Sequence, residues 1–205
     1  MIKLLIFDLG KVIFDLSFER VFQSWSHSSG VPVEHIKQNF SFSGIYEDFE
    51  TGKASPAFFR SQISALLKIS ISDDLFDKGW CNLYLDAYPE AERLLPILKR
   101  HFRLIALTNT NIIHEPVWQH KYGGALKHFE KVYSSHEVGL RKPDPRIYNH
   151  VLNDTGVKPQ EALFLDDNPD NVKGAEVCGI RSVLVDNPDQ MIRDLSIIVN
   201  LPLND

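Results

Sequence analysis

Four widely separated places in the chain carry side chains suited to phosphate chemistry. They are Asp8, Thr108 with Asn109, Lys142, and Asp166 with Asp167. Carboxylate oxygens are the protein ligands that Mg²⁺ prefers, and substrate phosphate often completes its coordination. Hydroxyl and ammonium groups stabilise the negative charge of a transferring phosphoryl group. If the fold gathers these side chains, they predict a metal-dependent site for a phosphate ester.

Each residue type has its own role in that chemistry. Asp8 can attack phosphorus and form an acyl-phosphate, which water then hydrolyses. Asp8 and Asp167 can supply carboxylate ligands to Mg²⁺, and the backbone carbonyl of Gly10 can supply a third. Thr108 can hydrogen-bond phosphate oxygens, and Lys142 adds a positive charge where negative charge collects in the transition state. We therefore predict Asp8, Thr108 and Lys142 as catalytic residues.

The candidate residues follow short apolar runs that have the pattern of buried strands. The runs span residues 3–8, 103–107, 131–134, 162–166 and 181–185. Helical patterns separate them, and Asp144, Asn168 and Asn187 each precede a proline, as helix N-caps often do. Strands alternating with capped helices predict an α/β fold with a doubly wound, Rossmann-like parallel sheet. In such sheets ligands bind beyond the carboxyl ends of the strands, where the candidate residues lie.

Residues 15–87 have a different pattern. Apolar side chains recur there at helical spacing, as at Phe18, Val21, Phe22 and Trp25, and no segment has strand periodicity. We therefore predict several consecutive amphipathic helices, inserted after the first strand as an all-helical cap domain. The α/β core domain then comprises residues 1–14 and 88–205. Within the cap, residues 41–53 are expected to select the substrate.

Composition excludes several other classes of protein. The 205 residues are 43% hydrophobic, with a formal net charge of −5, so the chain has no fold-wide basic surface for nucleic acid. No apolar stretch approaches the roughly 18 residues of a membrane span, and the start of the chain lacks signal-peptide features. Cys81 and Cys178 cannot form a disulfide framework. We expect a cytoplasmic monomer that acts on a small phosphorylated metabolite, without nucleic-acid or membrane partners.

Four motifs resemble those of the haloacid dehalogenase-like (HAD) superfamily. They are F-D-L-G-K-V at 7–12, L-T-N-T at 107–110, G-L-R-K-P-D-P-R-I-Y at 139–148 and F-L-D-D-N-P-D-N at 164–171. The resemblance implies that Asp167 binds the metal directly, that Asp166 assists, and that Asn109 and Thr110 bind substrate phosphate. The motif combination is similar to that of small bacterial α-D-glucose-1-phosphate phosphatases, which implies a small sugar phosphate as substrate.

The first motif departs from the common pattern at Gly10. Most HAD phosphatases have an aspartate there, which protonates the leaving group, and general acid catalysis contributes typically ~10²–10⁴-fold. Either the leaving group needs little protonation, as an anomeric sugar hydroxyl would, or another group supplies the proton. That group could be an ordered water or a cap residue such as His27, Glu47 or Asp48.

A third alternative is that the chain is not a phosphatase. Dehalogenases share the aspartate nucleophile but attack carbon without a metal, and an inactive relative would serve only to bind phosphate or to regulate. The adjacent Asp166 and Asp167 argue against a dehalogenase, because carboxylates this close to Asp8 repel one another without a cation. A Mg²⁺-dependent phosphatase is the favoured interpretation.

Overall fold

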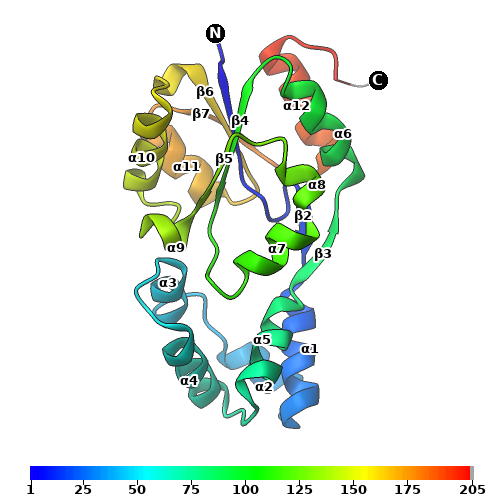
Figure 1. Ribbon diagram of the computed structural model, residues 1–205, viewed down its shortest axis with the longest axis vertical. Helices are drawn as coiled ribbons and strands as arrows, with labels where there is room; N and C mark the ends of the chain where they lie inside the picture. The colour runs from blue at the N-terminus through cyan, green and yellow to red at the C-terminus, as the bar shows by residue number, and fades with distance from the viewer. Residues whose placement is uncertain (204–205) are drawn as a thin grey trace.

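A five-stranded parallel sheet forms the centre of the computed structural model, which describes residues 1–203 (Figure 1). In spatial order the strands are β5 (Lys131–Ser134), β4 (Arg103–Thr108), β1 (Leu4–Phe7), β6 (Ala162–Asp166) and β7 (Arg181–Leu184). All five runs predicted as strands are strands of this sheet. β1 is central and its four residues are all buried, as expected for a strand covered on both faces.

Helices cover both faces of the sheet. On one face lie α10 (Pro145–Thr155) and α11 (Pro169–Val177), and on the other lie α6 (Pro89–Leu98), α8 (Gly123–Leu126) and α12 (Pro188–Val199) (Figure 1). Because side chains alternate along a strand, Leu4 and Ile6 pack in the core under α10 and α11, whereas Leu5 and Phe7 pack in the opposite core. The sheet, packed between these two cores, is the middle layer of a three-layer α/β fold.

Three helices of the α/β part begin where the sequence predicts. The side chains of Asp144, Asn168 and Asn187 each accept a hydrogen bond from a backbone N–H in the first turn of the helix that follows. Gly156 ends α10 with a φ of 66°, a left-handed conformation that glycine adopts without steric cost. Local capping therefore sets the helix boundaries next to the site.

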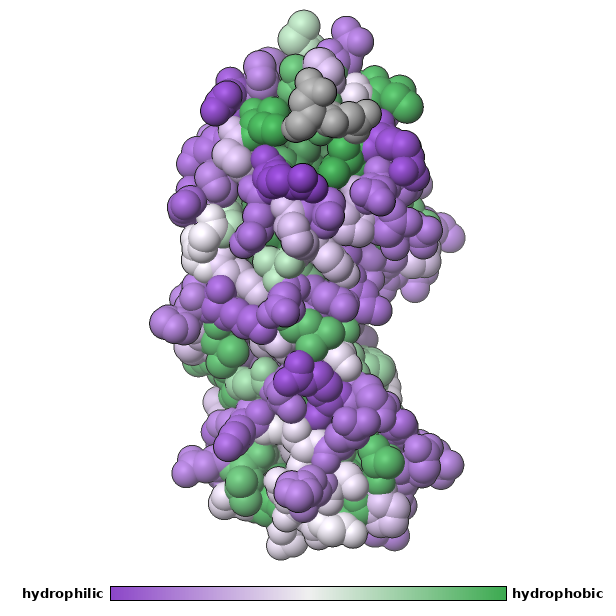
Figure 2. Space-filling model, turned by 90° about the vertical axis from the view of Figure 1, so that its right-hand side faces the viewer, coloured by the Kyte–Doolittle hydropathy of each residue, from purple (hydrophilic) through white to green (hydrophobic). Residues whose placement is uncertain are grey.

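Five helices form a separate layer below the carboxyl edge of the sheet. They are α1 (Phe18–Ser29), α2 (Val33–Asn39), α3 (Ile45–Glu50), α4 (Pro56–Leu67) and α5 (Asp73–Cys81). Their core is aromatic: Trp25 stacks on Trp80 with ring centroids 5.6 Å apart, and the Trp25 indole N–H donates to the Phe76 carbonyl. In space-filling view the outline narrows between this layer and the α/β part, and the surface is largely hydrophilic (Figure 2).

The prediction that residues 15–87 contain no strand is wrong. Two short antiparallel strands, β2 (Phe14–Leu16) and β3 (Tyr84–Ala87), form a ribbon where the chain leaves and re-enters the α/β part. Phe14 stacks on Tyr122 with ring centroids 3.9 Å apart, so the ribbon is anchored to the α/β part by aromatic packing. We propose that this ribbon marks the boundary between the core and the helical cap.

Two further helices, α7 (Glu115–Lys121) and α9 (Ser135–Val138), follow the carboxyl ends of β4 and β5. Across residues 1–203, no helix combines the length and apolar character required to span a bilayer.

Candidate active site

The predicted residues converge at the carboxyl edge of the sheet. Phe7 pairs with Ala106 on one side and with Leu165 on the other, so the residues that follow these strands lie side by side. All of the predicted site residues except Asp166 and Thr110 border a cavity of about 350 Å³ between the sheet edge and the helical layer. Its lining residues are Asp8, Gly10, Lys11, Phe14, Leu16, Phe18, Phe42, Tyr46, Glu50, Leu83, Tyr84, Thr108, Asn109, His114, Trp118, Arg141, Lys142, Asp167, Asn168 and Asn171.

Lys142 is the buried cation of this site. Its ammonium nitrogen lies 2.8 Å from Oδ1 of Asp8 and 2.6 Å from Oδ2 of Asp166, and only 1% of its side chain is exposed. Burial disfavours the charged lysine, but the two carboxylates outweigh burial and the pKa of Lys142 is raised. Lys142 is therefore a fixed positive charge beside Asp8.

Asp166 is held entirely by protein groups. Its Oδ1 accepts from the backbone N–H of Asn168 at 2.8 Å, both oxygens accept from the Asn171 amide, and Oδ2 accepts from Lys142. The side chain has no exposed surface. Asp166 thus orients Lys142 and the start of α11, while Asp167 lines the cavity beside it.

Asn109 positions the lysine through the backbone. Its side-chain amide donates to the Lys142 carbonyl and its side-chain oxygen accepts from the Lys142 N–H, both at 2.9 Å. This closed pair of hydrogen bonds joins the end of β4 to the loop before α10. Thr108, the last residue of β4, is buried and lines the cavity.

Thr110 lies apart from the other predicted residues. It is not among the residues that line the cavity, and its hydroxyl accepts from the Trp118 indole N–H at 3.1 Å. Its backbone N–H and carbonyl both bond to the Ser135 hydroxyl. In this arrangement Thr110 ties the loop after β4 to α7 and α9.

The donor set beside the cavity fits a hard cation. Asp8, Asp166 and Asp167 each place a carboxylate oxygen within 4.8 Å of the other two. Lys142 supplies one positive charge to three carboxylates, so a divalent cation would relieve the remaining repulsion. Burial raises the pKa of Asp8 above its ordinary value, with Lys142 opposing the shift and Asp166 adding to it. Burial and Asp166 likewise raise the pKa of Asp167.

An apolar side chain occupies the space beside Gly10. A Cβ atom on Gly10 would lie 2.5 Å from Cδ1 of Leu16, a separation that requires Leu16 to move. Gly10 lines the cavity next to Asp8, and Leu16 comes from strand β2. Position 10 carries no acid, and Leu16 of β2 fills the space that an acidic side chain would occupy.

None of the cap residues considered as proton donors lines this cavity. Glu47 pairs with Arg141 at the surface, and Glu47 and Asp48 both border a separate surface hollow. His27 borders another hollow near α5. The cap contributes instead the buried Tyr46 and Glu50 of α3. Helical spacing places both on the inner face of α3, but the sequence gives no sign of which face meets the sheet.

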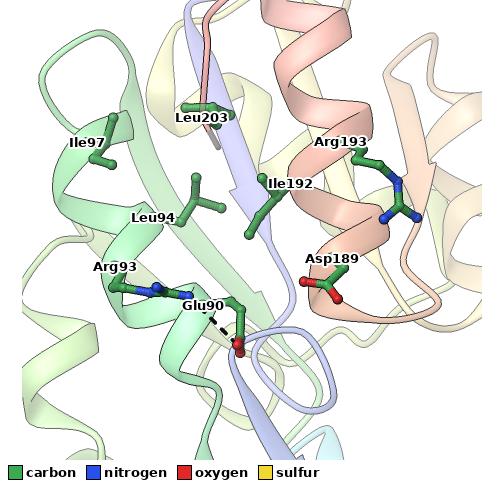
Figure 3. A pocket seen from close by; sticks show the side chains of 8 residues that line it. All are labelled: Glu90, Arg93, Leu94, Ile97, Asp189, Ile192, Arg193 and Leu203. Carbon is green, nitrogen blue, oxygen red and sulfur yellow. Dashed lines mark ion pairs between the residues drawn. The ribbon is translucent and has the colours of Figure 1, made fainter. Parts of the chain in front are cut away.

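A second hollow, of about 370 Å³, lies between α6 and α12 (Figure 3). Leu94, Ile192 and Leu203 give it an apolar wall, and an exposed ion pair between Arg93 and Glu90 lies at its edge. None of the predicted site residues lines it. The carboxyl edge of the sheet is therefore the candidate active site.

Comparison with known proteins identifies the family of the chain. Residues 2–179 match the haloacid dehalogenase-like hydrolase family. The chain belongs to this family. D-ribitol-5-phosphate phosphatase of Bacteroides thetaiotaomicron is 24% identical over 205 residues, which cover 98% of this chain and 100% of that protein.

Solved structures give the same fold. A HAD-family enzyme of Bacteroides thetaiotaomicron, crystallised with magnesium and inorganic phosphate, is 31% identical with a TM-score of 0.77, over 89% of this chain and 93% of that one. A HAD-like hydrolase of Porphyromonas gingivalis is 27% identical with a TM-score of 0.81, over 97% and 98%. The predictions of superfamily, fold class and a phosphatase enzyme are confirmed at this level.

Proposed function

We propose that this HAD enzyme is a Mg²⁺-dependent phosphomonoesterase that acts through a phospho-Asp8 intermediate on small sugar or sugar-alcohol phosphates. The observation that carries the proposal is the arrangement of Asp8, Asp166 and Asp167 around one buried lysine, beside a cavity of about 350 Å³. Such a set of charges has little use in a purely structural role, because unbalanced buried carboxylates destabilise a fold.

Asp8, Asp167 and the Gly10 carbonyl are the groups proposed to hold Mg²⁺. Asp166 would assist indirectly, by positioning Lys142 and the start of α11, because Lys142, Asn168 and Asn171 already hydrogen-bond to both of its oxygens. When bound, Mg²⁺ would offset the repulsion between an anionic nucleophile and an anionic phosphate. The magnesium in the related Bacteroides enzyme supports this choice of metal.

The side chains at the sheet edge have separate roles in the proposed reaction. An oxygen of Asp8 attacks phosphorus, Lys142 stabilises the charge on the phosphoryl oxygens, and the Thr108 hydroxyl donates a hydrogen bond to one of them. Asn109 acts through its hydrogen bonds to the Lys142 backbone, which hold the loop against β4. Thr110, predicted to bind substrate, is proposed to support the loop rather than touch phosphate.

The shape and chemistry of the cavity support a small polyhydroxylated substrate. Its volume lies at the lower end of the range of about 300–1,000 Å³ for small-molecule sites. Tyr46, Tyr84 and Glu50 offer polar groups, and aromatic rings at Phe14 and Phe18 offer apolar surface. Glucose 1-phosphate is the candidate substrate that the motif resemblance suggests. A sugar-alcohol phosphate is the candidate that the similarity to the D-ribitol-5-phosphate phosphatase of Bacteroides thetaiotaomicron suggests.

Phosphate release with and without EDTA separates the function classes. A metal-dependent phosphatase releases phosphate only when Mg²⁺ is present, a dehalogenase releases halide from 2-haloacids regardless of EDTA, and an inactive binding protein does neither. Asp8→Asn is the matched variant, and it should abolish turnover while the protein remains folded. Near-normal phosphate release from Asp8→Asn would refute the proposed nucleophile.

A panel of phosphate esters tests the substrate class. Glucose 1-phosphate, glucose 6-phosphate and D-ribitol 5-phosphate differ in the acidity of the leaving hydroxyl and in the shape of the carbon chain. A clear preference for glucose 1-phosphate would support an easily expelled leaving group as the compensation for Gly10. A preference for ordinary alkyl esters such as the other two would show that another group, either a protein side chain or an ordered water, supplies the proton.

A further inference from the structure

Glu50 is a buried carboxyl group in the wall of the cavity that the cap contributes. It is the last residue of α3, and only 4% of its side chain is exposed. The cavity that it lines is the one that Asp8, Lys142 and Asp167 border. A carboxyl group is costly to bury without full hydrogen bonding, so its retention here points to a use.

The contacts of Glu50 are incomplete. Its Oε2 lies 3.0 Å from Nε of Arg141, but within residues 1–203 neither atom has a hydrogen-bond partner of good geometry. Arg141 makes its well-directed contact with Glu47, at 2.8 Å through Nη1. The Glu50 carboxyl thus lines the cavity, and its close contact with Arg141 is not a well-directed hydrogen bond.

The direction of the reaction places the leaving group near the cap. In phosphoryl transfer the attacking and leaving oxygens lie roughly in line through phosphorus. Asp8 stands on the sheet side of the cavity, so the leaving oxygen points away from the sheet edge. α3 lies on the opposite side, in the layer below the sheet (Figure 1).

The histidine and the two tyrosines of the cavity wall are poorer proton donors. His114 uses both ring nitrogens, one toward the Asn111 amide and one toward the Trp80 carbonyl, and burial lowers its pKa to about 3. Burial raises the pKa of the Tyr46 and Tyr84 hydroxyls well above 10. Both phenols therefore keep their protons at neutral pH.

We propose that Glu50 is the acid and base of the reaction, in place of the aspartate that position 10 lacks. The proposal rests on the phosphatase function proposed above. As an Asp8 oxygen bonds to phosphorus, the bond from phosphorus to the leaving oxygen breaks and the Glu50 proton moves to that oxygen. This step produces the free alcohol and a Glu50 carboxylate.

The second step restores the acid. The Glu50 carboxylate takes a proton from the water that attacks phosphorus, the bond between Asp8 and phosphorus breaks, and inorganic phosphate leaves. Burial raises the pKa of Glu50 to about 7, with Arg141, Tyr46 and Lys142 opposing the shift. A pKa near the working pH suits a group that both donates and accepts a proton.

Two simple esters isolate the proton donor. Benzyl phosphate has an alkoxide leaving group that needs a proton, whereas the 4-nitrophenolate of 4-nitrophenyl phosphate does not. Neither ester has a hydroxyl for Glu50 to bind, so the ratio of their kcat/KM values reports protonation alone. The ratio is also independent of the fraction of protein that is folded.

We expect Glu50→Gln to lower kcat/KM for benzyl phosphate by ~10²–10⁴-fold, the usual contribution of a general acid, and for 4-nitrophenyl phosphate by less than about tenfold. Glu47→Gln is the matched control, because Glu47 lies on the same helix and pairs with the same arginine outside the cavity. The ratio of the kcat/KM values for the two esters should be the same in Glu47→Gln as in the wild type. Glu50→Asp, which keeps a carboxyl group, should recover part of the kcat/KM that Glu50→Gln loses on benzyl phosphate.

Three results would overturn the assignment: equal losses on both esters, no loss on either, or the same change of ratio in Glu47→Gln. Equal losses would mean that Glu50 only positions Arg141 and the cap. Failure of the wild-type enzyme to release phosphate from any ester is a different result, because it refutes the phosphatase function itself.

Discussion

The ammonium nitrogen of Lys142 lies 2.6 Å from Oδ2 of Asp166, and both side chains are almost completely withdrawn from solvent. The same nitrogen reaches Asp8 at 2.8 Å. One lysine therefore joins the carboxyl ends of two neighbouring strands, β1 and β6. This link makes Lys142 important for stability as well as for catalysis.

Lys142→Met should destabilise the protein by about 3–5 kcal/mol, because it leaves buried carboxylates without their cation. Urea unfolding at neutral pH without added metal measures the change. Lys131→Met is the control, since Lys131 of β5 forms an exposed ion pair with Asp154 of α10, and such pairs contribute little. Equal destabilisation by the two substitutions would contradict this role.

Mg²⁺ should raise the thermal midpoint of the wild-type protein even without substrate. A ligand at 100 times its Kd stabilises the native state by about 2.7 kcal/mol. Asp167→Asn should lose most of this stabilisation, whereas Asp170→Asn, an exposed substitution in the first turn of α11, should keep it. Differential scanning fluorimetry over a Mg²⁺ titration makes the comparison. A wild-type midpoint that does not respond to Mg²⁺ would count against the metal site.

Asn109→Ala should lower kcat by roughly 10²-fold, because a small misplacement of a catalytic group has a cost of that order. The substitution removes both hydrogen bonds that fix the Lys142 backbone. Steady-state kinetics on the best ester of the panel provides the measurement. Asn153→Ala, an exposed position on α10, controls for loss of an amide elsewhere. If kcat stayed the same and only KM rose, Asn109 would be a substrate ligand as the motif resemblance implies.

Gly10→Asp should be tolerated better in combination with Leu16→Ala than alone, because Leu16 fills the space beside position 10. The combined substitution places a carboxyl where most HAD phosphatases have one. In a Glu50→Gln background it should restore part of the turnover of benzyl phosphate. Turnover that stays at the Glu50→Gln level would show that a carboxyl at position 10 cannot act as the acid in this cavity.

The α/β part was predictable because its signals are local. Each strand of the parallel sheet is a short apolar run, and the helices α10, α11 and α12 each begin with a capping side chain and a proline. Parallel strands then bring their carboxyl ends together whatever the distance along the chain. For these reasons the positions of Asp8, Lys142 and Asp167 beside one cavity followed from the sequence.

The ribbon and the cap wall were not predictable in the same way. β2 and β3 have three and four residues, too few to reveal an alternating pattern, and each is defined by pairing with the other. Glu50 faces the cavity because of the way α3 packs against the sheet edge, and this packing depends on tertiary contacts that the local sequence does not specify. Thr110 turns toward Trp118 because of the loop geometry after β4, for which a four-residue motif gives no signal.

The most direct test of the central claim is to trap the aspartyl-phosphate at Asp8. Wild-type protein turning over its best ester with Mg²⁺ is quenched, treated with borohydride and digested, and the peptide containing residue 8 is analysed by mass spectrometry. Borohydride reduces an aspartyl-phosphate to homoserine, so the account predicts homoserine at position 8 only in samples that contained both ester and Mg²⁺. Rapid ester turnover with residue 8 always recovered as unmodified aspartate, and homoserine found at another position, would contradict it.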